Sequence, residues 1–97
     1  MRSVTERFLK YVSFDTMSDE FSETCPSTAK QKLLGAAIVE EMKAMGIADA
    51  YMDEHGYVYG TIPAKGDHPA KVGLIAHMDT SDGVVGPTVP QVIPNYD

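Results

Sequence analysis

The chemistry of the sequence concentrates in the stretch KVGLIAHMDTSDG, residues 71–83. Five of the six residues before His77 are uncharged and small or apolar, and Asp79 follows His77 two positions later. On an extended chain, side chains two residues apart leave the same face. An imidazole ligates a metal through one nitrogen while a carboxylate holds the other, because the carboxylate fixes the tautomer and makes the ring more basic. His77 and Asp79 therefore have the chemistry of a metal ligand and the acid that orients it.

Taken alone, the H-x-D triplet is a weak indication of a metal site, because it often occurs by chance. A catalytic zinc site uses about three protein ligands and a water, and the sequence shows no convincing second ligand. His55 and His68 fall in a turn and in a proline-flanked loop, where we expect them to be solvated. Cys25 has no basic partner nearby in the sequence, so we expect it to take no part in chemistry.

The apolar run that leads to His77 predicts a strand over residues 71–78. An uninterrupted apolar strand such as VGLIA is typical of a sheet that is covered on both faces. In open α/β sheets, ligands bind beyond the carboxyl ends of the strands. The predicted buried strand would thus place His77 and Asp79 where such a sheet binds its ligands.

Two amphipathic helices are predicted before this strand. Residues 3–14 form the first, with apolar side chains at helical spacing, namely Val4, Phe8, Leu9 and Val12. The second covers residues 28–45, where Thr28 and Gln31 match a capping box at its start. Its apolar stripe, expected in the core, consists of Leu34, Ile38, Met42 and Met45. Gly46 follows and supplies the left-handed conformation that ends many helices.

Loops and a hairpin complete the expected secondary structure. Residues 15–27 are polar, acidic and proline-containing, which predicts an exposed loop. The runs AYMD and YVYGTI flank Glu54-His55-Gly56, a β-hairpin pattern in which Gly56 adopts a positive φ. The predicted order is helix, helix, β-hairpin, buried strand, which is an α/β fold. Two helices are too few to cover both faces of its sheet. We therefore expect residues 1–97 to be the incomplete N-terminal segment of a longer domain; a free-standing small α+β domain is the alternative.

The composition is that of a soluble globular protein and argues against two classes of partner. The 97 residues are 43% hydrophobic and 23% charged, with a formal net charge of −6. Such a chain lacks the basic patch that displaces counterions from nucleic acid, and anionic membranes repel it. No window approaches the roughly 20 apolar residues of a membrane span. With one cysteine and no secretory signal pattern, the chain is expected in the cytoplasm.

Four motifs, in their order and spacing, resemble one known family. They are ERFLKYVSFDTMS near the start, PSTAKQKLLGAAIVEEMKAMG in the second helix, GYVYGTIPA in the hairpin and GLIAHMDTS at the site. Together they resemble the N-terminal portion of peptidase T, the aminotripeptidase branch of the zinc-dependent M20 metallopeptidases. The resemblance runs over nearly the whole chain. One departure is that the family usually reads T-S-P-D after the aspartate, whereas this sequence reads Thr80-Ser81-Asp82-Gly83, so the loop is expected to differ in geometry.

This resemblance implies a cytoplasmic zinc aminopeptidase that removes the N-terminal residue from tripeptides. The implied fold is a three-layer α/β/α zinc-exopeptidase catalytic domain that holds two zinc ions, with a smaller inserted domain that can form a homodimer. By position, His77 matches the family's first zinc-ligating histidine, and Asp79 matches the catalytic aspartate that supports it. The remaining ligands, the general base and the inserted domain would lie beyond residue 97, so residues 1–97 alone are expected to be inactive.

Two other interpretations stay open. A different M20 metallohydrolase, such as a dipeptidase or a deacylase, would share the H-x-D pair, and no substrate-defining residue is in view. A small non-catalytic α+β interaction module would carry H-x-D by chance. Such a module would take up no metal and would lose nothing on replacement of His77 by alanine.

Overall fold

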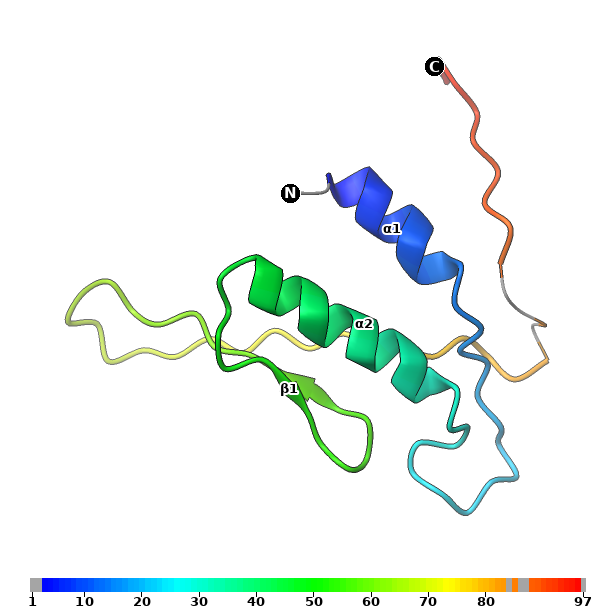
Figure 1. Ribbon diagram of the computed structural model, residues 1–97, viewed down its shortest axis with the longest axis horizontal. Coiled ribbons are helices and arrows are strands. Elements are labelled where there is room, and N and C mark those ends of the chain that lie inside the picture. The colour runs from blue at the N-terminus through cyan, green and yellow to red at the C-terminus, as the bar shows by residue number, and fades with distance from the viewer. Residues whose placement is uncertain (1–2, 84, 86–87, 97) are drawn as a thin grey trace.

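The computed structural model describes residues 3–83, 85 and 88–96 of the chain, as two helices and one hairpin (Figure 1). The elements are α1 (Val4–Val12), α2 (Gln31–Ala44), β1 (Tyr51–Met52) and β2 (Val58–Tyr59). The outermost residues of the predicted segment, 1–2 and 97, lie outside the described residues. No helix in the described ranges is long and apolar enough to cross a bilayer.

Helix α1 begins at a capping box that the sequence analysis did not identify. The Ser3 hydroxyl accepts a hydrogen bond from the Glu6 backbone N–H at 3.2 Å, and the Glu6 carboxylate accepts one from the Ser3 N–H at 2.7 Å. These two bonds satisfy backbone donors that a helix start otherwise leaves without partners. The helix ends at Val12, within the predicted range of 3–14, and Ser13 is its C-cap.

Helix α2 is shorter at its start than the predicted range of 28–45. Its N-cap is Lys30, whose side chain makes no capping hydrogen bond. The predicted capping box is wrong, because the Thr28 hydroxyl accepts a hydrogen bond from the Gln31 side chain at 2.9 Å rather than from a backbone N–H of the helix. The C-terminal prediction is confirmed, since Gly46 has a φ of +97° directly after the C-cap.

The hairpin predicted around residues 54–56 is confirmed. Strands β1 and β2 pair antiparallel, with Tyr51 opposite Tyr59 and Met52 opposite Val58. Gly56 has a φ of +84° in the turn, as expected. The turn is closed by Asp53, whose carboxylate accepts hydrogen bonds from the backbone N–H groups of His55 at 3.0 Å and Tyr57 at 2.9 Å.

The core lies where α2 packs on one face of this hairpin. Leu34, Val39 and Ala50 are its buried apolar side chains in the described ranges. Gly35 allows the close approach, because a Cβ at that position would lie 2.7 Å from the Met52 sulfur. The predicted apolar stripe is only partly buried. Met45, which we expected in the core, is 41% exposed; it is the C-cap of α2 and lines an open pocket beside α1.

The predicted buried strand at residues 71–78 is wrong for this structure. These residues run as an irregular segment without an arrow in Figure 1, and Leu74 and Ile75 are 95% and 100% exposed. A strand forms only when its backbone groups bond to a neighbouring strand. In the part of the chain that the structure describes, the sheet has two strands, neither of which pairs with this segment. The predicted α/β class is confirmed for a small unit of two helices and a two-stranded sheet. The three-layer arrangement is not seen among the described residues.

Candidate functional site

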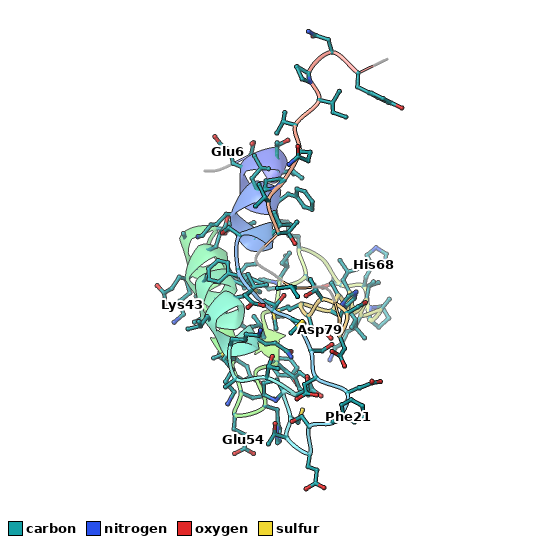
Figure 2. The ribbon with its side chains drawn as sticks, turned by 90° about the vertical axis from the view of Figure 1, so that its right-hand side faces the viewer. Glu6, Phe21, Lys43, Glu54, His68 and Asp79 are labelled. Carbon is teal, nitrogen blue, oxygen red and sulfur yellow. The ribbon has the colours of Figure 1, made fainter. Side chains whose placement is uncertain are left out.

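The structure brings His77 and Asp79 together. His77 Nδ1 lies 3.1 Å from Asp79 Oδ1, within hydrogen-bonding distance. The His77 side chain is 86% exposed and the Asp79 side chain 38% exposed. Figure 2 shows Asp79 on the same side of the ribbon as Phe21, away from the helix that carries Lys43. With Nδ1–H donating to the carboxylate, the tautomer leaves the Nε2 lone pair available as a ligand.

The backbone next to this pair is held by the loop that follows α1. Thr80 N–H donates to the Thr16 carbonyl at 3.1 Å, and the Thr80 carbonyl accepts from the Ser18 backbone N–H at 2.9 Å. The Ser18 hydroxyl donates to the same carbonyl, also at 2.9 Å. These contacts form an isolated parallel bridge between Met17 and Thr80. The predicted exposed loop at 15–27 is therefore corrected at its start, where Thr16 is 3% exposed.

The same loop is tied in turn to the start of α2. The Thr28 hydroxyl donates to the Met17 carbonyl at 2.8 Å. Lys30 Nζ donates to Asp15 Oδ2 at 2.9 Å, and Met17 N–H donates to Asp15 Oδ1 at 3.3 Å. The Lys30 hydrogen bond, helped by the Met17 N–H, holds the pKa of the Asp15 carboxyl below its ordinary value. A continuous path of polar contacts thus runs from α2 through the loop to Thr80.

The sequence analysis missed Thr16 and Ser18. The contact of Ser18 with Thr80 spans 62 residues, and that of Thr16 spans two more. No local sequence pattern predicts a pairing at such a separation. Their types give only a weak signal, since Ser and Thr are ordinary loop residues that bond to backbone groups. Asp82 also reaches this loop, because its carboxylate accepts a hydrogen bond from Glu20 N–H at 3.4 Å.

The donor set fits part of a zinc site. Imidazole nitrogen is a preferred zinc ligand, and the carboxylate on Nδ1 is the usual supporting contact. Within the described residues, however, no group of three or more His, Cys, Asp or Glu side chains gathers to hold a metal. His55 and His68 are exposed, as predicted. The described residues therefore place an imidazole nitrogen that could serve as a ligand beside an acid that orients it, and a metal held there would need ligands from outside these residues.

An apolar groove of about 790 Å³ adjoins the pair. Helices α1 and α2, the hairpin and residues 74–78 contribute to its walls, and the His77 ring lines it as well. Several apolar side chains along it are open to solvent, including Phe8 at 60% exposed and Leu74 at 95%. Contiguous apolar surface of this kind is typical of a face that packs against more protein.

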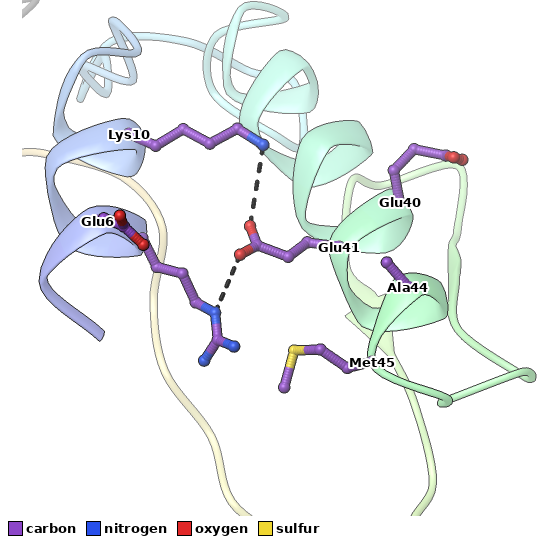
Figure 3. A pocket seen from close by; sticks show the side chains of 7 residues that line it. Glu6, Lys10, Glu40, Glu41, Ala44 and Met45 are labelled. Carbon is purple, nitrogen blue, oxygen red and sulfur yellow. Dashed lines mark ion pairs between the residues drawn. The ribbon is translucent and has the colours of Figure 1, made fainter. Parts of the chain in front are cut away.

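A second pocket, of about 850 Å³, lies between α1 and α2 and contains an ion cluster (Figure 3). Glu41 is its centre. Its Oε1 lies 3.0 Å from Arg7 Nε, its Oε2 lies 3.8 Å from Lys10 Nζ, and Tyr11 OH donates to Oε2 at 2.9 Å. The buried Arg7 Nε makes no hydrogen bond of good geometry, so we treat its contact with Glu41 as an ion pair. Arg7 and Lys10 on α1 both pair with the one Glu41 carboxylate on α2, so these contacts join the two helices, which indicates a structural role.

Cys25 lies at the hairpin turn rather than at the site. Its sulfur is 3.7 Å from the Tyr57 hydroxyl, and the residue is exposed. The contact with Cys25 raises the pKa of the Tyr57 hydroxyl above its ordinary value. Neither group contacts His77 or Asp79 in any hydrogen bond or ion pair of the described residues.

The chain is similar in sequence to several curated proteins named Peptidase T. No family model matches it. The whole chain aligns over 100 residues with Peptidase T of Clostridium acetobutylicum at 51% identity, and it covers 24% of that protein. Over 96 residues, 97% of it is 45% identical to Peptidase T of Bacillus subtilis, of which it covers 23%. A Geobacillus Peptidase T is 47% identical over 96 residues. The chain thus spans about a quarter of the length of these curated relatives. These similarities confirm the resemblance predicted from the motifs: the chain matches, over essentially its whole length, a portion of peptidase T consistent with the N-terminal one.

Proposed function

We propose that the chain is the N-terminal segment of a zinc-dependent aminotripeptidase, which releases the N-terminal residue of tripeptides. The observation that carries this proposal is the similarity of the whole chain, at 42–51% identity, to proteins named Peptidase T. The contact between His77 and Asp79 supports it, because these two residues match the H-x-D motif that the family uses to hold zinc. The finer elements of the proposal are a cytoplasmic location, two zinc ions and a homodimer formed through a domain outside this chain.

In this proposal His77 is a zinc ligand through Nε2, and Asp79 is the catalytic aspartate that supports it. The Asp79 carboxylate accepts a hydrogen bond from Nδ1–H, keeps the ring from rotating and makes Nε2 a better electron-pair donor to the metal. When bound, zinc supplies Lewis acidity toward water and a peptide carbonyl group. The chain's own contribution is therefore to fix one ligand in position and in the correct tautomer.

The segment alone is proposed to be inactive. Catalytic zinc sites use about three protein ligands, and the described residues offer His77 with its supporting acid. The exposed apolar surface at residues 72–75 also favours a segment over a free-standing module, because Val72, Leu74 and Ile75 are at least 87% exposed. In the proposed three-layer α/β/α domain, strands from the remaining polypeptide would pair with this segment and bury those side chains.

The experiment compares a full-length polypeptide that carries this chain with the 97-residue chain, each supplied with zinc and a tripeptide. We expect turnover from the full-length protein and none from the short chain. His77→Ala should abolish turnover and weaken zinc binding, and Asp79→Ala should reduce turnover far more than stability. His68→Ala is the matched control and should behave as wild type. Normal turnover in His77→Ala, or hydrolysis by the short chain, would refute the proposal.

A further inference from the structure

The contacts around Thr80 carry a further inference about Ser18. Thr80 directly follows Asp79, so the Thr80 N–H belongs to the peptide plane that joins the two residues. The Thr16 carbonyl fixes this N–H at 3.1 Å, and Ser18 fixes the Thr80 carbonyl. The two peptide planes on either side of Thr80 are thus both held from the loop. Because the Asp79 side chain projects from the first of these planes, its direction depends on the loop.

The loop itself is firmly held, which makes it suitable for this role. Thr28, just before α2, donates a hydrogen bond to the Met17 carbonyl at 2.8 Å. Lys30 Nζ donates to Asp15 Oδ2 at 2.9 Å, which ties the first residue of the loop to the N-cap of α2. Thr16 is buried although it lies in a polar stretch. By contrast, residues 71–77 are exposed and have no strand partner among the described residues. The bridge at Thr80 therefore anchors this segment to the loop that follows α1.

We propose that Ser18 is a positioning residue for the His77–Asp79 pair, acting through its two hydrogen bonds to the Thr80 carbonyl. This inference rests on the proposed function, since it takes His77 as a metal ligand. Ser18 touches neither side chain of the pair. Its hydroxyl limits the rotation of the Thr80–Ser81 peptide plane. Together with the Thr16 contact on the preceding plane, this fixes the Thr80 backbone and so keeps the Asp79 carboxylate within reach of His77 Nδ1. Removing the hydroxyl leaves the Ser18 backbone N–H in place, so we expect a graded loss rather than a complete one.

The test measures the zinc affinity of the full-length polypeptide by competition with a chelator. Ser18→Ala should bind zinc roughly three- to tenfold more weakly, the range expected for one hydrogen bond. Ser18→Cys keeps nearly the same size with a weak donor and should show a similar loss. Ser18→Thr retains a hydroxyl and should restore the wild-type affinity. Ser22→Ala is the matched control, because the Ser22 hydroxyl bonds to Thr24 within the same loop.

A second measurement separates positioning from general stability. In the zinc-free protein, the ring ¹⁵N shifts of His77 should report a single tautomer in wild type and a mixture in Ser18→Ala, with little change in the melting temperature. Equal zinc affinity and identical ring shifts in Ser18→Ala and wild type would overturn the inference. So would an equal loss in Ser18→Thr, since that would show that the hydroxyl is not what matters. If His77→Ala binds zinc as wild type does, the proposed function itself has failed. This result differs from the two Ser18 outcomes above, which overturn only the role of Ser18.

Discussion

Glu41 joins α1 to α2, and replacing it tests how these helices are held together. Its carboxylate contacts Arg7 Nε at 3.0 Å and accepts a hydrogen bond from Tyr11 OH at 2.9 Å. Glu41→Gln keeps the shape of the side chain and removes its charge. The amide oxygen can still accept the hydrogen bond from Tyr11. The loss of stability in Glu41→Gln therefore reports mainly on the ion pair.

The burial of the pair sets the size of the expected effect. The side chains of Glu41 and Arg7 are 12% and 19% exposed. Exposed ion pairs contribute about 0.2–1 kcal/mol to stability, whereas removing one partner of a fully buried pair costs about 3–5 kcal/mol. This pair lies between these limits. We therefore expect Glu41→Gln to lower the free energy of unfolding by about 1–2 kcal/mol.

The assay is urea unfolding, followed by circular dichroism, in a double-mutant cycle of Glu41→Gln and Arg7→Gln. We expect a coupling energy of at least about 0.5 kcal/mol between the two sites. Glu40→Gln is the control. Glu40 neighbours Glu41, is exposed and makes no ion pair among the described residues, so its replacement should change stability by less than about 0.5 kcal/mol. A coupling energy near zero, or an equal loss in Glu40→Gln, would refute the reasoning.

Three further predictions concern the frame around the site. Gly35→Val should lower the free energy of unfolding by about 1–3 kcal/mol, because its Cβ would meet the Met52 sulfur at 2.7 Å; thermal melts measure this. Asp53→Ala should lower the free energy of unfolding by about 1–2 kcal/mol, because two backbone N–H groups of the hairpin turn lose their acceptor. Amide hydrogen exchange at these two groups should become faster. The lowered pKa of Asp15 means that its contact with Lys30 stabilises the fold above the ordinary carboxyl range, and that this stability is lost as the pH falls through the lowered value. Asp15→Asn should therefore flatten the acid limb of a stability–pH profile, and an unchanged limb would contradict the assignment.

Local patterns in the sequence predicted the elements that local contacts build. The hairpin follows from Gly56 and the alternating residues around it, and the end of α2 follows from Gly46. Both depend on backbone geometry within a few residues. The predicted start of α2 is wrong because the Thr28 hydroxyl has two other partners, the Met17 carbonyl and the Gln31 side chain. The hydroxyl donates to the Met17 carbonyl, 11 residues away, and this distant contact replaces the expected cap.

Long-range pairing accounts for what the sequence did not predict. The run VGLIA has the composition of a buried strand, but a strand needs a neighbour, and composition cannot say whether that neighbour lies within the same 97 residues. The contact between His77 and Asp79 was predictable because the two residues are close in sequence. The support that Thr80 receives from Ser18 was not, because 62 residues separate these two positions.

The most direct test of the account is a crystal structure of the full-length polypeptide grown with zinc, with anomalous data collected at the zinc edge. We predict a zinc peak about 2.0–2.1 Å from His77 Nε2, with the Asp79 carboxylate hydrogen-bonded to Nδ1 of the same ring. Zinc bound by other residues, with His77 facing solvent and Asp79 turned away from it, would contradict the central claim.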